Sequence, residues 1–459
     1  MSNINQTRLN TSNINQKYLR DLITKARSVL EINDCGTHTV PAAGLYPHQV
    51  LWDSCFIAIG RSHYDAERAK SEVTSLLSAQ WRNGMIPHII FSDEKRYWWD
   101  RRIWRSWINP EAASTKASSG ISQPPMLAEA VVCIGQQLSD KKKIDWYKSI
   151  FSQLVAYHLW LHKERDPRNE GLVVQLHPWE TGLDNSPPCM IELRAKNWPK
   201  WLKTLDKPLI DKLINYFRFD SKYVQHGERA SNSESLALYN LLKKIRRSKY
   251  NSKAILQDPA FAIQDITYNC ILARADNLLL DISKTINAKL PSELSIYIVK
   301  TSDSLESLWD KHDLQYYSRQ FLSGKLIKES SIGTFMPLYA GTISHKRAVE
   351  LVKLMENDTK LGLKFPIPTV SASSPWFSEY KYWQGPTWIN TNWLIIDGLK
   401  RYGFYKQART LAIRTLQLVN DSGFYEYYDS LTGTPRGVNN FSWTAALIID
   451  LAYKFPNSG

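Results

Sequence analysis

Two carboxylic acids four residues apart, Glu180 and Asp184, are the first residues whose types and spacing could do chemistry. They stand in "LHPWETGLDNSPP", beside the indole ring of Trp179 and a double proline. An acid among apolar side chains loses solvation, which raises its pKa and keeps it protonated near neutral pH. Such a group can serve as a general acid, and these residues alone leave both acids as candidates.

Three further segments join aromatic rings to polar side chains in the same way. Aromatic faces can hold sugar rings, and carboxylates or amides can bind sugar hydroxyls. Glycoside hydrolysis needs two carboxyl groups across such a pocket, one to protonate the leaving oxygen and one to activate water or attack the anomeric carbon. Four segments of this kind favour a carbohydrate-active enzyme. The other three are "YPHQVLWDSCF" (46–56), "YWQGPTWINTNW" (382–393) and "FYEYYDSLTGTPRG" (424–437).

Several of these motifs resemble glycoside hydrolase family 63, above all its small bacterial and plant members, the mannosylglycerate and glucosylglycerate hydrolases. The likeness runs from about Tyr46 to about Leu447 and covers most of the chain. It rests on "HPWETGLDNSP", on "YWQGPTWINTNWLI" followed by "GLKRYG", and on "YEYYDSLTG" followed by "FSWTAAL". The resemblance implies an inverting glycoside hydrolase, without a metal or cofactor, that acts on a small α-glucoside or α-mannoside such as glucosylglycerate or mannosylglycerate.

The resemblance assigns the two acids of the reaction. It implies that Asp184 is the general acid and that Glu426, in "YEYYD", is the general base. In an inverting enzyme the two carboxyl groups lie about 6.5–9.5 Å apart, with the attacking water between them. The neighbouring tyrosine hydroxyls could hold Glu426 ionised. Glu180 is then better explained by a supporting role in its loop, although we keep it among the residues expected to contact the substrate.

The resemblance also implies a set of substrate-binding residues. The segment with Tyr46, Trp52 and Asp53 is expected to grip the sugar at the bottom of the pocket. Arg229 is expected to pair with a substrate carboxylate, because a guanidinium fork suits that role. The remaining expected contacts are Tyr97, Gln123, Trp179, Tyr382, Gln384 and Trp388.

Two positions depart from the family pattern. Val50 stands where a second Trp is expected in a "HQWLWD" pattern, and the segment after Arg229 lacks a Pro and a downstream Tyr. Both departures concern the aglycone side of the pocket. The resemblance therefore predicts glycoside cleavage more firmly than it predicts the glycerate aglycone.

Helices must position these residues, because apolar side chains recur at three- and four-residue spacing along most of the chain. Segment 391–399 is apolar on more than one face, which predicts an inner helix. The best strand candidates are 171–178 and 313–321. The periodicity predicts about a dozen helices, among them 18–32, 71–81, 125–138, 146–162, 233–247, 261–284, 345–356, 387–402, 405–419 and 441–454.

No linker of Gly, Ser or Pro divides the chain, so we expect a single all-α catalytic domain over residues 1–459. The resemblance implies that this domain is an (α/α)6 toroid, two concentric rings of helices with the active site at one mouth. Two stretches, 92–120 and 185–230, interrupt the helical pattern. We expect them to be loop insertions that form a lid over the mouth.

The overall composition limits which partners and which cellular compartment are expected. The net charge of +14 comes from dispersed Lys and Arg, without a phosphate loop or zinc ligand set, so nucleic acid is not an expected partner. The chain lacks an apolar run of membrane-spanning or signal length. The five cysteines are odd in number and widely spaced, which favours reduced thiols and a cytoplasmic protein. The expected partner is a small carbohydrate, and the sequence is also compatible with a homo-oligomer.

Structural explanations compete with several of these functional ones. Asp53 could cap a helix that begins after it, Arg229 could be a surface residue, and Gln123 could simply end a loop. His158 and His162 have the i, i+4 spacing of a metal pair, but Leu159 stands where a zinc hydrolase needs Glu, so we expect surface histidines. For the whole chain, the alternatives are a non-catalytic carbohydrate-binding or sensing protein on the same fold and a nucleic-acid-associated helical repeat.

Overall fold

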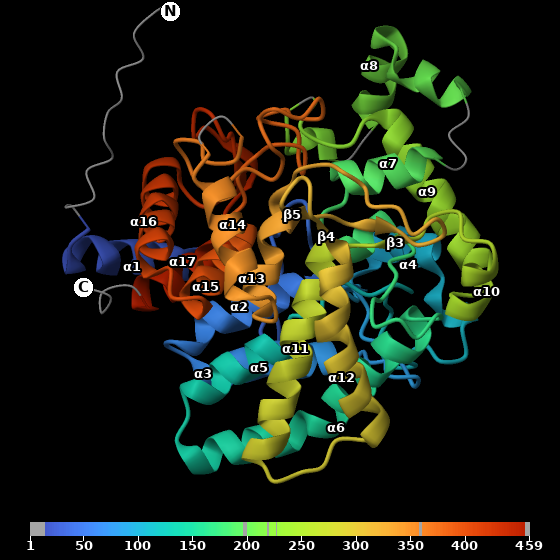
Figure 1. Ribbon diagram of the computed structural model, residues 1–459. Coiled ribbons are helices and arrows are strands. Elements are labelled where there is room, and N and C mark those ends of the chain that lie inside the picture. The colour runs from blue at the N-terminus through green and yellow to red at the C-terminus, as the bar shows by residue number, and fades with distance from the viewer. Residues whose placement is uncertain (1–13, 196–199, 218–219, 226, 358–359, 455–459) are drawn as a thin grey trace, which may run out of the picture.

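Helices dominate the computed structural model, which describes residues 14–195, 200–217, 220–225, 227–357 and 360–454 (Figure 1). Every structural statement below concerns these residues. Twelve of the helices alternate along the chain between an outer and an inner position. This alternation builds two concentric rings from helical hairpins.

The inner ring closes on itself. Each inner helix packs against the next, and the last packs against the first. In chain order these helices are α2 (Leu51–Ser62), α5 (Leu127–Gln136), α11 (Ile266–Thr285), α13 (Met336–Ala340), α15 (Ile389–Arg401) and α17 (Ser442–Lys454). Every residue of α2 is buried, and α15 is buried on nearly all sides, as the apolar segment 391–399 predicts.

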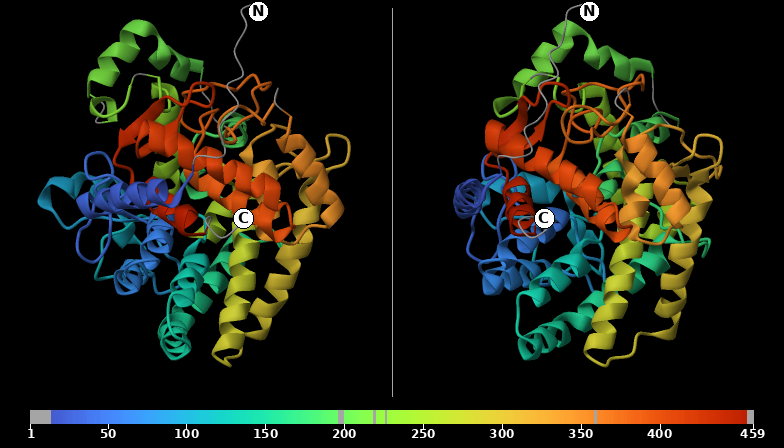
Figure 2. Two further views of the ribbon diagram at one scale, coloured as in Figure 1. Left: turned by 90° about the vertical axis from the view of Figure 1, so that its left-hand side faces the viewer. Right: turned by 60° about the vertical axis from the view of Figure 1, so that its left-hand side comes forward.

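The outer ring covers the inner one with amphipathic helices. For example, α1 packs on α17, α3 on α2, and α16 on α15. Figures 1 and 2 both show α12 lying alongside α11. The outer helices are α1 (Gln16–Ile32), α3 (Ala66–Leu77), α6 (Asp140–Arg165), α12 (Ser292–Ser304), α14 (His345–Met355) and α16 (Tyr405–Ser422). The expected all-α (α/α)6 toroid is therefore confirmed.

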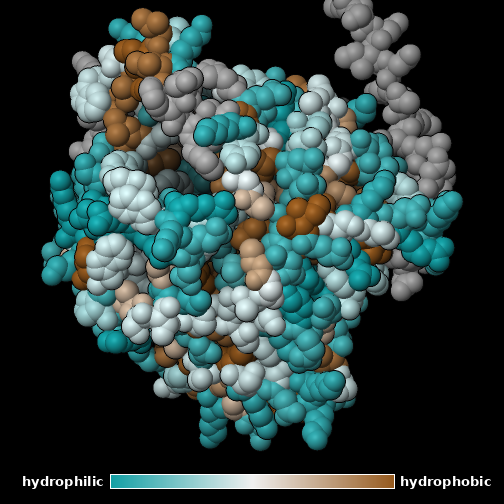
Figure 3. All heavy atoms as spheres, turned by 180° about the vertical axis from the view of Figure 1, so that it is seen from behind, coloured by the Kyte–Doolittle hydropathy of each residue, from teal (hydrophilic) through white to brown (hydrophobic). Residues whose placement is uncertain are grey.

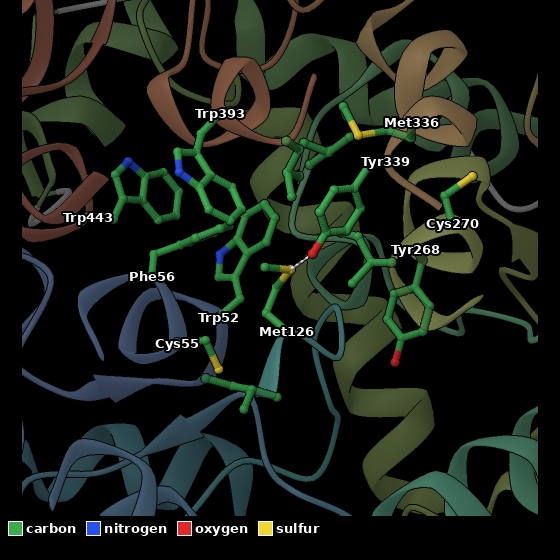
Figure 4. Close-up of a cluster of buried hydrophobic side chains, with 14 of the residues drawn as sticks. Trp52, Cys55, Phe56, Met126, Tyr268, Cys270, Met336, Tyr339, Trp393 and Trp443 are labelled. Carbon is green, nitrogen blue, oxygen red and sulfur yellow. Dashed lines mark hydrogen bonds between the residues drawn. The ribbon is translucent and has the colours of Figure 1, made fainter. Parts of the chain in front are cut away.

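Large side chains fill the centre of the inner ring. Figure 4 shows Trp52 and Phe56 of α2 near Trp393 of α15 and Trp443 of α17. The rings of Trp52 and Trp443 meet edge to face with their centroids 5.4 Å apart. The hydroxyl of Tyr339 donates a hydrogen bond to Glu129 at 2.9 Å and lies 3.8 Å from the sulfur of Met126. Much of the aromatic content of the chain is therefore core packing.

Glycine allows two inner helices to touch along their backbones. A Cβ atom on Gly60 of α2 would lie 2.1 Å from the carbonyl oxygen of Ala446 in α17. Real Cβ atoms do not approach an oxygen this closely, so a larger residue would push the helices apart. This contact holds α2, which carries Trp52 and Asp53 in its first turn, close against α17.

Short helices lie on one side of the toroid. Segment 92–120 holds the 3₁₀ turns η2 (Lys95–Tyr97) and η3 (Ser106–Ile108) around α4 (Trp98–Trp104). Segment 185–230 was expected to be a loop, but it contains two helices. Those helices are α7 (Pro187–Ala195) and α8 (Pro208–Phe217). The 3₁₀ turn η5 (Lys200–Asp206) lies between them, and the 3₁₀ turn η6 (Asp220–Lys222) follows α8. Further along, α9 (Asn232–Arg247) and α10 (Ser252–Gln257) lead back to the ring.

Helix α8 stands out from the rest of the molecule at the top of Figures 1 and 2. Its residues Leu209 and Leu213 are exposed by 83% and 63%. Figure 3, which views the molecule from behind, shows this part as a brown, apolar projection at the upper left.

Strands are few and short in the described residues, and each sheet has two of them. The strand candidate 313–321 contains β5 (Gln315–Tyr316) and β6 (Arg319–Gln320), whereas 171–178 contributes a single bridge from Gln175 to Ile263. The other strands are β1 (Gln49–Val50), β2 (Ile89–Ile90), β3 (Ile263–Gln264), β4 (Trp309–Asp310), β7 (Tyr425–Tyr428) and β8 (Pro435–Asn439).

The two spaced histidines are buried, which corrects the expectation that they lie on the surface. His158 Nδ1 lies 2.7 Å from one carboxylate oxygen of Asp276, and His162 Nε2 lies 3.1 Å from the other. The three side chains tie outer helix α6 to inner helix α11. Histidines at this spacing face one side of a helix, and here that side faces the core instead of solvent.

Candidate active site

A cavity of about 430 Å³ opens among the loops of the toroid, and most of the expected site residues line it. The segments that resemble one another in composition are far apart in sequence, yet the ring brings them together. The expected residues on the cavity wall are Tyr46, Trp52, Asp53, Gln123, Trp179, Asp184, Arg229, Tyr382 and Glu426.

Asp184 is placed on this wall by a tight turn. The 3₁₀ turn η4 (Pro178–Thr181) ends at Gly182, whose left-handed backbone (φ 72°) glycine adopts without strain, and Asp184 follows two residues later. Burial raises the pKa of Asp184 to about 7, and the charge of Glu426 adds to the rise while Arg229 and the hydroxyl of Tyr382 oppose it. A carboxyl group with this pKa is protonated in a large fraction of molecules at neutral pH, as a proton donor must be.

Glu426 has the opposite surroundings. It lies on β7, is 1% exposed, and accepts four hydrogen bonds. Tyr46 donates from its hydroxyl at 2.9 Å, and the backbone N–H of Val438 donates across the β7–β8 sheet at 3.3 Å. Arg229 donates from Nη1 at 3.0 Å to one oxygen and from Nη2 to the other. A carboxyl group with donors on both oxygens is held as an acceptor, which is the form that a general base needs.

Tyr382 connects the surroundings of the two acids. Its hydroxyl donates to Asp184 Oδ2 at 3.4 Å, and its ring lies 4.3 Å below the guanidinium of Arg229. Tyr382 has a left-handed backbone (φ 36°), which is uncommon for a bulky residue and directs the side chain toward the cavity wall. These contacts join Asp184, Tyr382, Arg229 and Glu426 into one network.

Arg229 does not have the free position that was expected for a receptor of a substrate carboxylate. Its side chain is only 9% exposed and forms a two-pronged ion pair with Glu426. The structure thus excludes the alternative of a surface arginine. It also shows that any anionic group on a substrate would meet an arginine that already has a partner.

Asp53 is a third carboxyl group on the cavity wall. It lies in the first turn of α2, whose N-cap is Val50, so it does not cap the helix. Burial, and next the charges of Glu426 and Asp184, raise the pKa of Asp53 well above its usual value. A protonated carboxyl group can both donate and accept, which suits a sugar hydroxyl.

The loop around Tyr382 corrects two expected contacts. Trp388 is fully buried behind Trp383, and their rings stack 3.7 Å apart, so Trp383 lines the cavity and Trp388 does not. Gln384 donates to the backbone oxygen of Asn185 at 2.8 Å and is buried. It holds the Tyr382 loop against the Asp184 loop and does not reach the cavity. Sequence spacing could not show which side of this loop faces inward.

Two further expected contacts lie outside the cavity wall. Glu180 forms a buried two-pronged ion pair with Arg165, whose Nη1 and Nη2 lie 2.8 and 2.6 Å from the two carboxylate oxygens. This ion pair gives Glu180 the supporting role in its loop that the sequence analysis favoured. Tyr97 lies half-buried on η2, with its ring 4.9 Å from that of His48. Gln123 does line the cavity, and its side-chain oxygen accepts the backbone N–H of Trp52 at 3.5 Å.

Other wall residues were not identified from the sequence. Trp104 belongs to α4, and the centroids of its ring and that of Trp179 lie 5.9 Å apart. Because Trp104 lines the cavity, part of segment 92–120 does border it. His88 is neutral, because burial lowers its pKa to about 3. The motif "FSWTAAL" contains Trp443 and could have pointed to it as a wall residue. No motif in the sequence pointed to His88. The remaining unpredicted wall residues include Phe441, Leu238, Ser235 and Trp383.

Neither a metal site nor a membrane span is found in the part of the chain that the structure describes. The described His, Cys, Asp and Glu side chains form no group of three that could hold a metal ion. None of the described helices has both the length and the apolarity to cross a membrane.

Comparisons with known proteins find similar proteins over nearly the whole chain. A family described as mannosylglycerate hydrolase MGH1-like glycoside hydrolase domain matches residues 46–444. A mannosylglycerate hydrolase of Thermus thermophilus is 38% identical over 428 residues, which cover 93% of this chain and 99% of that protein. A glucosylglycerate hydrolase of Mycolicibacterium hassiacum is 30% identical over 454 residues, which cover 94% and 97%.

A solved structure shares the fold over nearly the whole chain. The crystal structure of the glycoside hydrolase family 63 mannosylglycerate hydrolase from Thermus thermophilus, in complex with Tris and D-glycerate, superposes with a TM-score of 0.83. The two sequences are 36% identical, and the match covers 94% of this chain and 99% of that one. A neutral trehalase of Saccharomyces cerevisiae, 17% identical with a TM-score of 0.56 and coverage of 92% and 73%, shares the fold alone.

Proposed function

This chain belongs to the mannosylglycerate hydrolase MGH1-like glycoside hydrolase family, and from that premise we propose that it cleaves mannosylglycerate or glucosylglycerate with inversion at the anomeric carbon. The chain is a glycoside hydrolase of family 63. Its proposed substrates are small α-linked glycosides whose aglycone carries a carboxylate.

One observation carries the proposed mechanism. Two carboxyl groups with opposite surroundings, Asp184 and Glu426, line the same cavity. Asp184 has a pKa near 7 and can give its proton to the glycosidic oxygen as the bond breaks. Glu426, held as an acceptor, can take a proton from the water that attacks the opposite face of the sugar.

The remaining wall residues suit the two halves of such a substrate. Asp53 and the rings of Trp52 and Trp443 form a compact polar and aromatic surface that fits a hexose. Arg229 supplies positive charge for a carboxylate. The cavity lies within the usual size range of small-molecule sites, about 300–1,000 Å³.

We also assign the protein to the cytoplasm. All five cysteines are free thiols, and four of them are buried. Unpaired thiols are typical of proteins in reducing compartments. Assembly into a homo-oligomer stays a prediction, which analytical ultracentrifugation can check.

Hydrolysis of the two glycerate glycosides tests the proposal. The purified protein should release the free hexose and glycerate from at least one of them without added metal. Replacement of the acid in Asp184→Asn should remove nearly all turnover while the protein still binds the substrate. If both glycosides stabilise the wild-type protein against unfolding but neither is cleaved, the chain is instead a carbohydrate-binding protein on this fold.

A further inference from the structure

We propose that Arg229 acts as a gate on Glu426. In the ligand-free protein the guanidinium occupies both oxygens of the base, and a carboxylate on the aglycone releases the base by competing for the guanidinium. This inference rests on the proposed function, because it takes Glu426 as the base. It goes beyond that function in making the anionic group of the substrate a requirement for catalysis.

The hydrogen bonds of Glu426 show why a gate is needed. One oxygen accepts from Tyr46 at 2.9 Å and from Arg229 Nη1 at 3.0 Å. The other accepts from Arg229 Nη2 and from the backbone of Val438 at 3.3 Å. A carboxylate has about four acceptor sites, so these donors fill them. A base must accept a proton from water at one of these sites, and in this state none is left.

Of the donors to Glu426, Arg229 is the one that can leave. The N–H of Val438 belongs to the backbone of β8, whose pairing with β7 fixes it. The ring of Tyr46 is packed edge to face on Phe441, with the centroids 6.0 Å apart. Arg229, by contrast, reaches Glu426 with a long side chain from the bend before α9, and it borders the cavity.

The pairing with Glu426 also leaves one hydrogen-bond donor of Arg229 unused. Its Nε atom is buried and has no hydrogen-bond partner. An unsatisfied buried donor is costly, and a guanidinium has a second edge that can bind a carboxylate with two hydrogen bonds. A carboxylate that used this edge would satisfy Nε, and its negative charge would draw the guanidinium away from Glu426.

The charges on the wall favour competition for Arg229. Among the described wall residues, Arg229 is the one Lys or Arg side chain, and it stands with four acids, Asp53, Asp184, Asp220 and Glu426. A carboxylate on the substrate therefore has a single cation to pair with there. The guanidinium also lies over the ring of Tyr382 at 4.3 Å, and this aromatic face offers it support as it moves.

The test compares an anionic and a neutral substrate of the same sugar. Wild-type protein is assayed with the glycerate glycoside and with the methyl α-glycoside, and acetate is then titrated into the methyl glycoside assay. Because a general base contributes about 10²- to 10⁴-fold, we expect kcat for the methyl glycoside to be lower by about 100-fold or more. Acetate, which can occupy Arg229, should raise this kcat in a saturable manner.

The variant Arg229→Gln separates a gate from a simple support. If Arg229 blocks the base, the variant should hydrolyse the methyl glycoside faster than wild type and should no longer respond to acetate. An equal loss of kcat on both substrates in this variant would show that Arg229 only positions Glu426, and would overturn the gate. A lack of activation by acetate in the wild type would overturn it as well.

A control variant guards against a general effect of losing an arginine. Arg347→Gln removes an ion pair with Glu306, 3.4 Å apart and outside the cavity, and it should keep wild-type kinetics on both substrates. Circular dichroism and thermal unfolding check the fold of each variant. If the glycerate glycoside is cleaved without any acetate effect, the gate alone fails. If no glycoside is cleaved at all, the proposed function fails with it.

Discussion

At the scale of single residues, the chemistry depends on how differently three acids are surrounded. Burial and neighbouring negative charge raise the pKa values of Asp53 and Asp184, whereas Glu426 receives hydrogen bonds on both oxygens. Pairs of carboxyl groups with opposed environments are the usual arrangement of an acid and a base in one site. In the proposed mechanism the same functional group, a carboxyl group, takes three roles because the fold gives it three environments.

The pKa of Asp184 predicts a loss of activity at alkaline pH. Because the acid must be protonated in the free enzyme, kcat/KM should fall about tenfold per pH unit above roughly pH 7. A pH profile of kcat/KM with the glycerate glycoside measures this. A profile that stays flat up to pH 9 would contradict the assignment of Asp184 as the acid.

The same shift predicts that Asp184 destabilises the fold at high pH. The folded-state pKa lies above the unfolded one, so folding loses stability as the pH rises from about 4 through about 7. The effect is at most about 4 kcal/mol. Asp184→Asn should therefore raise the Tm relative to wild type at pH 8 and much less at pH 5. Equal differences in Tm at both pH values would argue against a raised pKa.

At the scale of elements, buried polar contacts hold outer helices on inner ones. Burial opposes the charge of Asp276, but the attraction of His162 and hydrogen bonds from His158 and His162 outweigh it and lower the pKa of Asp276. Its contribution to stability is therefore present above the unfolded pKa of about 4 and is lost as the pH falls below that value. This pairing joins α6 to α11 away from the cavity.

Removal of this carboxylate should loosen α6 without affecting the chemistry. Asp276→Ala leaves two buried imidazoles without their acceptor, and breaking a buried pair costs about 3–5 kcal/mol. Urea unfolding at pH 7 measures the loss. Asp281→Ala on the same helix removes an exposed pair with Lys284 and should cost about 0–1 kcal/mol. Equal losses in the two variants would contradict the structural role of Asp276.

The contact between α2 and α17 predicts a second effect at this scale. Because a Cβ on Gly60 would meet the backbone of Ala446 at 2.1 Å, Gly60→Ala should destabilise the protein by about 1–3 kcal/mol. The displaced α2 carries Trp52 and Asp53, so KM should rise too. Unfolding curves and steady-state kinetics check both effects, and wild-type values in both would show that the helices are free to separate.

The sequence pattern predicted the outer helices with one apolar face well, and it also predicted the buried inner helices α15 and α17 to within two residues at each end. Outer helices such as α16 and α14 match their predicted segments closely, since half of each helix meets solvent. Helix α2 was not among the helices predicted from periodicity, although a helix after Asp53 was considered; all its sides are buried, so its apolar residues show no helical period. Helices α7 and α8 were taken for loop although each begins at proline, a residue that is tolerated in the first turn of a helix.

The sequence predicted which motifs form the site better than it predicted which way the side chains of those motifs face. The resemblance to glycoside hydrolase family 63 pointed to Asp184, Glu426 and most of the wall residues, whereas the aromatic and acidic clusters alone left Glu180 and Asp184 both as candidates. The sequence could not show that Trp388 and Gln384 face away from the cavity, or that Arg229 pairs with Glu426. These facts depend on how distant loops meet, and no local pattern records them.

At the scale of the whole molecule, the closed inner ring separates stability from chemistry. The aromatic centre and the close helix contacts fix the ring, and loops from distant parts of the chain carry the cavity wall. Rigid helices therefore hold Asp53, Asp184 and Glu426 in one place although they are far apart in sequence. Because the ring is held independently of these positions, residues around Arg229 and Val50 can vary without disturbing the proposed catalytic pair.

The most direct test of the central claim follows the anomer that is released first. Wild-type protein is mixed with α-mannosylglycerate or α-glucosylglycerate, and proton NMR records the product before mutarotation. Inversion through Asp184 and Glu426 predicts that the β-hexose appears first, and that Asp184→Asn and Glu426→Gln each lower kcat by about 100-fold or more with the fold intact. Release of the α-hexose first, or near wild-type turnover in either variant, would contradict the account.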